Sequence, residues 1–358
     1  MKKILLCLVS LCLMAGAICD ASQGADNRNK YLMPIYRVSV ERDLVYSEAS
    51  GFWTSYPDTG EDFMTIYANK TEDLLRGRTN CLLTMDIYTP VRDRAESRPL
   101  LVFIHGGAFF NGDKATEPIV KWCEYFASLG YVVASINYRL GFIPTPHAII
   151  EAAYRAYRDT QTAINFLMFR KEKYKIDPDR VFVAGSSAGG ITALNMAFMK
   201  EKDWPWRGTT KYEANPWEGY HYKVVAVANL WGAVQNLKVL SNSDSAVISF
   251  HSRWDPVVPF AYDYPFRQLS YVKNILFDRM YGSSMIHEEL KRLERPTELY
   301  AYDLDIHELY YDENHNISPR LEEMMRSTAE FFSKQMRNVI KLEKRNHQLP
   351  SFSIGPIG

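Results

Sequence analysis

The chain has 358 residues, of which 47% are hydrophobic and 23% charged, so it has the composition of a globular protein with a substantial core. Lysine plus arginine and aspartate plus glutamate both total 42, which gives a formal net charge of zero. Because no basic block is interleaved with aromatic residues, the sequence does not favour a nucleic-acid partner. No internal repeat or low-complexity linker divides the chain, so we predict a single domain over residues 22–340.

The first 21 residues have the order of a secretory signal peptide. Two lysines precede an apolar run over residues 4–17, which ends in small residues. We expect cleavage near residues 17–21 and export to a periplasm, the cell surface or the extracellular medium. The apolar run is too short to span a bilayer comfortably, and no later stretch is long enough to form a transmembrane span. Lipid attachment at Cys19 is the alternative, although Ile18 matches the small residue expected there poorly.

The body of the chain contains two cysteines, Cys81 and Cys123. In an oxidising compartment two cysteines can form one bridge, but the sequence does not show whether these two meet. They have no C-x-x-C spacing and no nearby histidine cluster, so no metal site is expected.

From about residue 81, short β-type runs alternate with helix-type segments. The predicted strands are 82–88, 100–104, 131–136, 181–184, 224–230, 247–250 and 299–302. Most of these runs are continuously apolar, as expected for parallel strands covered on both faces. Apolar residues recur at helical spacing over 119–129, 153–167 and 321–336, and Ser318-Pro319 is a start signal for the last helix. The alternation predicts an α/β protein with a doubly wound, mostly parallel sheet.

Three segments lie outside this alternation. Residues 26–80 should supply edge strands and loops, and residues 341–358 should form a peripheral C-terminal tail. Residues 201–222 are an aromatic insertion of the kind that forms lids or binding loops. Its candidate substrate-binding residues are Trp204, Trp206 and Trp217, although most of the rings in this segment should simply pack it onto the core.

Residues 185–189 read G-S-S-A-G and lie where a strand gives way to a helix. In a G-x-S-x-G turn the central serine, here Ser187, is exposed on a sharp bend as a nucleophile. The next backbone N–H, that of Ala188, lies at a helix N-terminus, where a developing oxyanion is stabilised. The strand-to-helix context is what gives this short pattern its weight.

A second motif, H-G-G-A-F over residues 105–109, directly follows an apolar strand. A glycine pair at this point lets the chain turn so that backbone N–H groups face the nucleophile. We therefore predict an oxyanion hole made by Gly107, Ala108 and Ala188. A glycine turn with no catalytic role is the alternative, but two such motifs in this order at two strand ends disfavour it.

Four stretches carry a resemblance to a known family: D-I-Y-T-P (86–90), L-L-V-F-I-H-G-G-A-F-F-N-G-D-K (100–114), Y-V-V-A-S-I-N-Y-R-L-G-F (131–142) and Y-K-I-D-P-D-R-V-F-V-A-G-S-S-A-G-G (174–190). They resemble the carboxylesterase and hormone-sensitive-lipase-like esterases of the α/β-hydrolase superfamily, in particular secreted bacterial feruloyl and acetyl esterases. The likeness is good over residues 81–200 and looser over 245–335. It implies the α/β-hydrolase fold, a serine, an acid and a histidine, and no cofactor. Ala108 stands where many relatives have a third glycine.

The resemblance also suggests the acid. The segment H-S-R-W-D-P-V-V-P after the strand at 247–250 is similar to the family's H-G-x-x-D-x-x-V-P, which makes Asp255 the expected acid, with Ser252 in place of the usual glycine. Its role would be to accept the Nδ1–H of the base and to stabilise the imidazolium. Asp263 and Asp244 are the alternative candidates for the acid.

The base should lie on the loop after the strand at 299–302. His307 fits this position, although the glycine that precedes the histidine in many relatives is missing. His315, in a polar turn just before the last helix, is the alternative. His287 suits a surface position better, and His105 and His251 suit structural positions at strand ends.

Together these residues predict a secreted serine ester hydrolase that acts on a small-molecule or carbohydrate ester through an acyl-enzyme. Two other functions are kept open: an exported serine peptidase on the same fold, and a binding protein without catalysis. The sequence does not fix the natural ester or the oligomeric state.

Overall fold

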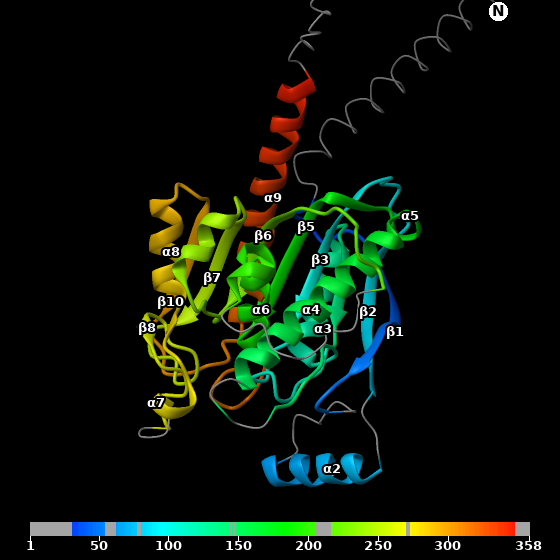
Figure 1. Ribbon diagram of the computed structural model, residues 1–358. Coiled ribbons are helices and arrows are strands. Elements are labelled where there is room, and N and C mark those ends of the chain that lie inside the picture. The colour runs from blue at the N-terminus through cyan, green and yellow to red at the C-terminus, as the bar shows by residue number, and fades with distance from the viewer. Residues whose placement is uncertain are drawn as a thin grey trace, which may run out of the picture.

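An eight-stranded sheet forms the centre of the computed structural model, with the strand order β1-β2-β4-β3-β5-β6-β7-β10 (Figure 1). The structure describes residues 31–53, 62–76, 80–142, 145, 148–204, 216–269 and 273–347. The strands of this sheet are β1 (Arg37–Ser50), β2 (Asn80–Val91), β3 (Arg98–Ile104), β4 (Val132–Ile136), β5 (Ile176–Ser186), β6 (Val224–Leu230), β7 (Ala246–Ser252) and β10 (Thr297–Tyr302).

Two antiparallel edge strands extend an otherwise parallel sheet. β1 pairs antiparallel with β2 and β2 antiparallel with β4, whereas every pairing from β4 to β10 is parallel. The predicted α/β-hydrolase fold with its mostly parallel sheet is therefore confirmed. All seven strands predicted from apolar runs are present, and β1 supplies the edge strand expected between residues 26 and 80.

Helices cover both faces of the sheet. The described helices are α2 (Phe63–Leu75), α3 (Glu117–Ser128), α4 (Ala148–Phe169), α5 (Lys171–Tyr174), α6 (Ala188–Phe198), α7 (Lys273–Leu276), α8 (Ser283–Arg292) and α9 (Arg320–His347), with 3-10 turns at Glu201–Asp203 and Leu237–Asn242. A hairpin of β8 (Tyr262–Asp263) and β9 (Met280–Tyr281) lies beside the main sheet. Figure 1 shows α2 set apart from the sheet, below its end.

The core consists of two apolar layers separated by the sheet. In β3 the side chains of Leu100, Val102 and Ile104 belong to the layer under α4, α6 and α8, and those of Leu101 and Phe103 to the layer under α3 and α9. This alternation follows from the two-residue period of a strand. All seven residues of β3 are buried, which explains the continuous apolar run over residues 100–104. Full burial of each large side chain stabilises the fold by about 1.5–3 kcal/mol.

The two cysteines of the body do not meet. Cys81 and Cys123 are buried in different core layers, with the sheet between them, so no disulfide joins them. Burial raises the pKa of the Cys123 thiol well above its ordinary value, so this thiol is a packing group.

Helix α9 continues to His347 and so includes the first residues of the segment predicted as a peripheral C-terminal tail from residue 341. Residues 338–347 contain no proline or glycine and are rich in lysine, glutamate and arginine, which favour a helix. At the other end of α9 the predicted start signal is present, since the Ser318 hydroxyl accepts a hydrogen bond from the Arg320 N–H at 3.3 Å. Helices α2 and α8 were not predicted.

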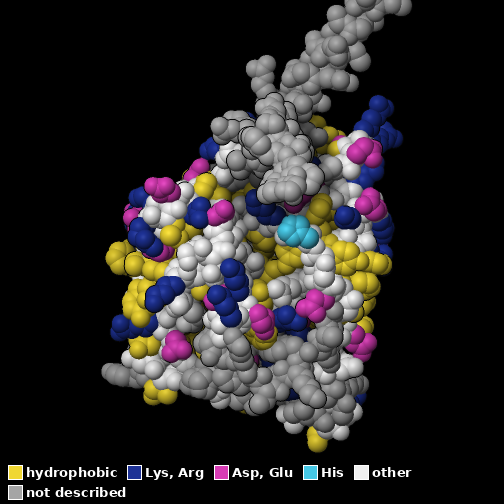
Figure 2. Space-filling model, turned by 45° about the horizontal axis from the view of Figure 1, so that its top comes forward, with side chains coloured by type: hydrophobic (Ala, Val, Ile, Leu, Met, Phe, Trp, Pro, Cys, Tyr) yellow, Lys and Arg dark blue, Asp and Glu magenta, His cyan; other side chains and the backbone are white. Residues whose placement is uncertain are grey.

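The predicted signal peptide and Cys19 lie outside the described residues. Within the part of the chain that the structure describes, no helix is both long and apolar enough to cross a membrane. On the face drawn in Figure 2, the described basic and acidic side chains are interspersed, in keeping with their equal numbers in the sequence.

Candidate active site

Ser187 lies on a sharp turn between β5 and α6. Its backbone has φ 54° and ψ −119°, a conformation that L residues rarely adopt and that costs of order 1–3 kcal/mol. The turn is fixed by a hydrogen bond from the Ser187 N–H to the Leu230 carbonyl at 2.8 Å. Only glycine fits at position 189, because a Cβ there would lie 2.0 Å from the Ile104 carbonyl oxygen. The strand-turn-helix context expected for the G-x-S-x-G motif is thus present.

The loop after β3 lies directly against this turn. A Cβ added at Gly106 would lie 3.3 Å from the Ser187 Cβ. Gly107 has φ 101° and Ala108 has φ 53°, and both left-handed conformations turn the chain back beside the serine. Ala108 adopts its conformation without the third glycine of many relatives.

The three predicted oxyanion donors lie on the two chain turns next to Ser187. Among the hydrogen bonds between described residues, none uses the N–H of Gly107, Ala108 or Ala188. Ala188 is the first residue of α6, so its N–H has no partner within the helix and carries part of the positive end of the helix dipole. Ala108 and Ala188 line the same cavity as Ser187, although Gly107 is not among the residues that line it. Such donors can stabilise negative charge that develops beside the serine oxygen.

His307 reaches the serine from the loop after β10. Its Nε2 lies 2.8 Å from the Ser187 Oγ, and its Nδ1 lies 2.9 and 2.8 Å from the two carboxylate oxygens of Asp255. No residue from 303 to 308, all of them described, has a positive φ, so this loop does not need the glycine found in many relatives. The structure therefore brings together Ser187, Asp255 and His307, which the sequence analysis predicted from distant positions in the chain.

Asp255 is held on the loop after β7. Its Oδ1 accepts hydrogen bonds from the backbone N–H groups of Val257 (2.7 Å) and Val258 (3.0 Å). Burial raises the pKa of Asp255, but hydrogen bonds from His251 and His307 outweigh burial and lower the pKa to about 2. The carboxylate is thus ionised at neutral pH and can hold the Nδ1 proton of His307.

The alternative candidates for the acid and the base lie away from Ser187. Asp244 forms an ion pair with Arg295, and Asp263 is exposed in β8. His315 is exposed in a turn, with its ring beside that of Tyr311. His287 contacts the Thr297 hydroxyl through its Nδ1, at 3.1 Å.

A mainly apolar cavity of about 270 Å³ opens beside Ser187. Its walls come from α4 (Ile149, Ile150, Ala153), α6 (Ile191, Asn195), the segment after α6 (Met199, Asp203, Trp204), the segment after β6 (Val234, Gln235, Asn236, Val239), and the loops containing Val257, Val258, Pro265, Phe266, Phe277 and Met280. The lining suits an apolar group attached to the atom that the serine attacks.

The tryptophans of the aromatic insertion have different positions. Trp204 lines the cavity and packs against Tyr154 and Tyr157 of α4. Trp217 does not line the cavity, because it stacks on Phe169 and donates a hydrogen bond to the Tyr46 carbonyl. Trp206 lies outside the described residues. The ring of Trp217 packs the insertion onto α4 and β1, away from the cavity beside Ser187, and its role as a substrate-binding residue stays a prediction.

Comparison with known proteins agrees with this geometry. The family described as BD-FAE matches residues 85–257. Gut esterase 1 of Caenorhabditis elegans is 30% identical over 117 residues, which cover 32% of this chain and 20% of that protein. Arylacetamide deacetylase of Oryctolagus cuniculus is 35% identical over 165 residues, which cover 44% of this chain and 37% of that protein. Over the matched residues the chain is similar to esterases of the α/β-hydrolase superfamily.

A solved structure extends the likeness of this α/β-hydrolase to the whole fold. MGS-M1, an α/β-hydrolase enzyme from a Medee basin deep-sea metagenome library, superposes with a TM-score of 0.50 at 16% identity, covering 85% of this chain and 100% of that chain. The chain matches only 20% and 37% of the length of the two curated relatives above.

Two residues of this α/β-hydrolase site were not predicted from the sequence. Trp231, fully buried after β6, has φ 45°, and its ring lies edge-on to His307 with the centroids 6.2 Å apart. A bulky residue in the left-handed region is a true conformational outlier, and such outliers gather at functional sites. His251 was considered structural, yet its Nε2 lies 3.3 Å from the Asp255 carboxylate. The spacing of four residues between His251 and the acid was the available signal.

Proposed function

We propose that this protein is an exported serine ester hydrolase in which Ser187, His307 and Asp255 form the catalytic triad. The observation that carries the proposal is the continuous chain of contacts from the Ser187 Oγ through both nitrogens of His307 to Asp255, with an apolar cavity beside the serine. The names of the two curated relatives, an esterase and a deacetylase, support acyl transfer to water.

The proposed reaction begins with attack on the ester carbonyl. His307 accepts the proton of the Ser187 hydroxyl as the serine oxygen bonds to the carbonyl carbon, and the Asp255 carboxylate stabilises the imidazolium that forms. The negative charge on the carbonyl oxygen is stabilised by backbone donors of Ala108 and Ala188, assisted by Gly107.

The second half of the reaction regenerates the serine. His307 donates its new proton to the alcohol oxygen as the C–O bond breaks, which leaves an acyl-serine. His307 then takes a proton from a water molecule that attacks this acyl group, and returns the proton to the Ser187 oxygen as the acyl–oxygen bond breaks and the acid is released. The distance of 2.8 Å between the His307 Nε2 and the Ser187 Oγ is within the range needed for direct proton transfer.

For the substrate, we propose an ester whose acyl group is apolar and whose alcohol is a small molecule or a carbohydrate. The cavity supports the apolar acyl group, since its walls are mainly aliphatic and aromatic. The ring of Trp204 supports the carbohydrate, because an aromatic face can stack on a sugar. Export is supported by the order of charged, apolar and small residues over positions 1–21.

The test is hydrolysis of p-nitrophenyl acetate, butyrate and octanoate by the purified protein, with Ser187→Ala as the control. We expect activity that the control lacks, and covalent labelling of Ser187 by a fluorophosphonate probe. Feruloylated and acetylated oligosaccharides, compared at equal concentration, test the carbohydrate. Equal rates for wild type and Ser187→Ala would refute the serine mechanism, and cleavage of peptide amides alone would point to a peptidase.

A further inference from the structure

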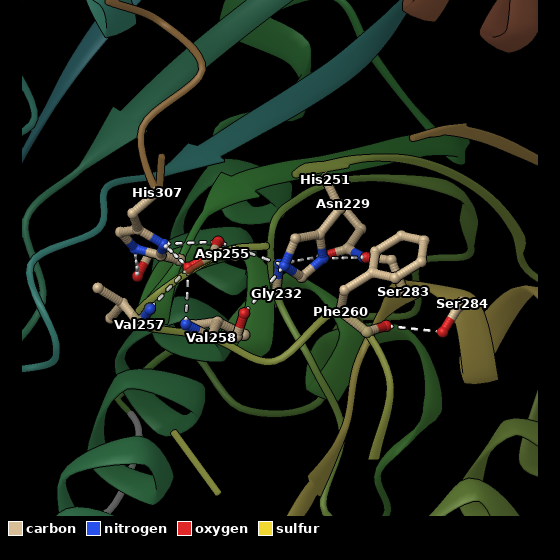
Figure 3. Close-up of polar contacts among 11 residues, drawn as sticks. Asn229, Gly232, His251, Asp255, Val257, Val258, Phe260, Ser283, Ser284 and His307 are labelled. Carbon is tan, nitrogen blue, oxygen red and sulfur yellow. Dashed lines mark hydrogen bonds and ion pairs between the residues drawn. The ribbon is translucent and has the colours of Figure 1, made fainter. Parts of the chain in front are cut away.

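Asp255 lies between two histidines. His307 contacts it from the side of Ser187, and His251 from the opposite side, with the His251 Nε2 3.3 Å from Oδ2. The side chains of both His251 and Asp255 are completely buried. Figure 3 shows His307, Asp255 and His251 in a row, with Asn229 and Ser283 continuing beyond His251.

The hydrogen bonds beyond His251 fix the position of its proton. The Gly232 N–H donates to the Asn229 Oδ1 at 2.9 Å, so the other atom of that amide, Nδ2, is the donor. This Nδ2 lies 3.0 Å from the Ser283 Oγ, which therefore accepts a hydrogen bond from Asn229. The Ser283 hydroxyl has one proton of its own to donate, and the His251 Nδ1 lies 2.8 Å away.

This series of hydrogen bonds makes the His251 Nδ1 an acceptor and leaves the ring proton on Nε2. Both groups that Nε2 faces, the Asp255 carboxylate at 3.3 Å and the Val258 carbonyl at 3.1 Å, are acceptors. The neutral Nε2–H tautomer thus satisfies every partner of the ring. The opposite tautomer would take from the Ser283 proton its acceptor and leave an unprotonated Nε2 facing two acceptors.

We infer that His251 is a positioning residue, which the Asn229–Ser283 pair holds as the Nε2–H tautomer so that it donates to Asp255 from behind. This inference rests on the proposed function of the triad. The donor fixes the carboxylate plane, so that both oxygens of Asp255 stay within hydrogen-bond distance of the His307 Nδ1. It also holds the Val258 carbonyl, and therefore the loop that follows Asp255.

The start of α8 is built to hold this network in place. Ser283 is the first residue of α8, and the next residue, Ser284, bonds to the Phe260 carbonyl through both its N–H (3.0 Å) and its hydroxyl (2.8 Å). At Gly282 a Cβ would lie 1.8 Å from the Pro259 carbonyl oxygen, so α8 and the loop after Asp255 approach as closely as backbone allows. The Ser283 hydroxyl is therefore fixed relative to the acid.

The test compares variants that lose the donor with one that keeps it. His251→Leu removes the ring N–H, whereas His251→Gln can place an amide N–H at the same point. We expect His251→Leu to lower kcat roughly 10- to 100-fold with little change in KM, as for loss of one hydrogen bond to a buried charge, and His251→Gln to recover most of kcat. His287→Leu, in the same helix as Ser283 but facing Thr297, is the matched control and should leave kcat unchanged.

Loss of stability must be separated from loss of positioning. His251→Leu leaves the Ser283 hydroxyl without its acceptor, which destabilises the fold. The double variant His251→Leu/Ser283→Ala removes that orphaned hydroxyl and should recover stability in urea unfolding while kcat stays low. If kcat instead rises together with stability, His251 has only a structural role and the inference is overturned.

The tautomer is measured directly by two-bond ¹H–¹⁵N correlation spectra of ¹⁵N-histidine-labelled protein, with His251 assigned by its absence in His251→Gln. We expect a protonated Nε2 and an unprotonated Nδ1 in wild type, and a displaced His307 Nδ1–H resonance in His251→Leu. A protonated Nδ1, or equal kcat in wild type and His251→Leu, overturns the inference. If wild type shows no serine-dependent hydrolysis, only the proposed function is refuted. The inference about His251 is then still tested by the tautomer that the spectra report.

Discussion

Acid should destabilise the protein through His105, the first residue of the H-G-G-A-F motif. The ring is buried, its Nδ1 donates to the Gly106 carbonyl at 2.7 Å, and it stacks on Tyr138 with the centroids 4.5 Å apart. Among the described residues no partner contacts its Nε2. Burial lowers the pKa of His105 to about 4, because protonation would bury a charge at that nitrogen.

The direction and size of this change in stability follow from the linkage between proton binding and folding. In the unfolded chain a histidine takes up a proton near pH 6.5, whereas folded His105 resists it down to about pH 4. Stability is therefore complete above pH 6.5 and falls as the pH drops from 6.5 to about 4. At 1.36 kcal/mol per pH unit the full loss is about 3 kcal/mol, a large share of the stability of a typical domain.

The assay is urea unfolding at pH 7.5, 6.0, 5.0 and 4.5, for wild type and for His105→Asn. Asparagine can keep the donor to the Gly106 carbonyl but cannot take up a proton. We expect the free energy of unfolding of wild type to fall more steeply with acid than that of His105→Asn, so that the two curves converge. Parallel curves would show that His105 does not resist protonation in the folded state, and would refute the reasoning.

Three further predictions concern the acid, the oxyanion loop and the cysteines. Asp255→Asn should lower kcat about 10³- to 10⁴-fold with the fold intact by circular dichroism, because an amide no longer holds the Nδ1 proton of His307; an effect below tenfold would contradict this role. Gly107→Ala should lower kcat by at least about 10²-fold, because the residue has φ 101° and the new Cβ would lie 2.1 Å from the loop backbone. Near-normal kinetics of this variant would contradict the role of the loop. Cys81 and Cys123 should both be alkylated after unfolding without reductant, as peptide mass spectrometry would show; a linked peptide pair would contradict the separation of the two core layers.

The sequence was sufficient for the fold and for the triad because the relevant signals are local. Continuous apolar runs predict the buried parallel strands, and each triad residue lies on a loop directly after such a run. Where the local motif departed from the family, the backbone explains why little changes. Ser252 has no positive φ, so the missing glycine is not needed there.

The cavity and the network behind the acid were not predictable in the same way. Ile149 of α4 and Phe266 are 117 positions apart, and only the fold makes them neighbours around Ser187. Likewise Asn229, His251 and Ser283 come from β6, β7 and α8, and their hydrogen bonds depend on how close α8 packs. The sequence could not separate Trp204 from Trp217, because an aromatic side chain has the same sequence signature whether it lines a pocket or packs a loop.

The acid and one wall of the cavity belong to the same short loop. Val257 and Val258 donate their N–H groups to Asp255, and both also line the cavity beside Ser187. A change of side-chain size on this wall therefore strains the support of the carboxylate and affects the chemical step together with substrate binding. The wall formed by α4, which includes Ala153, has no hydrogen bond to the triad among the described contacts. That wall can therefore change the accepted acyl group without moving the acid, so acyl-chain preference should depend on α4 and the rate of the chemical step on the loop after β7.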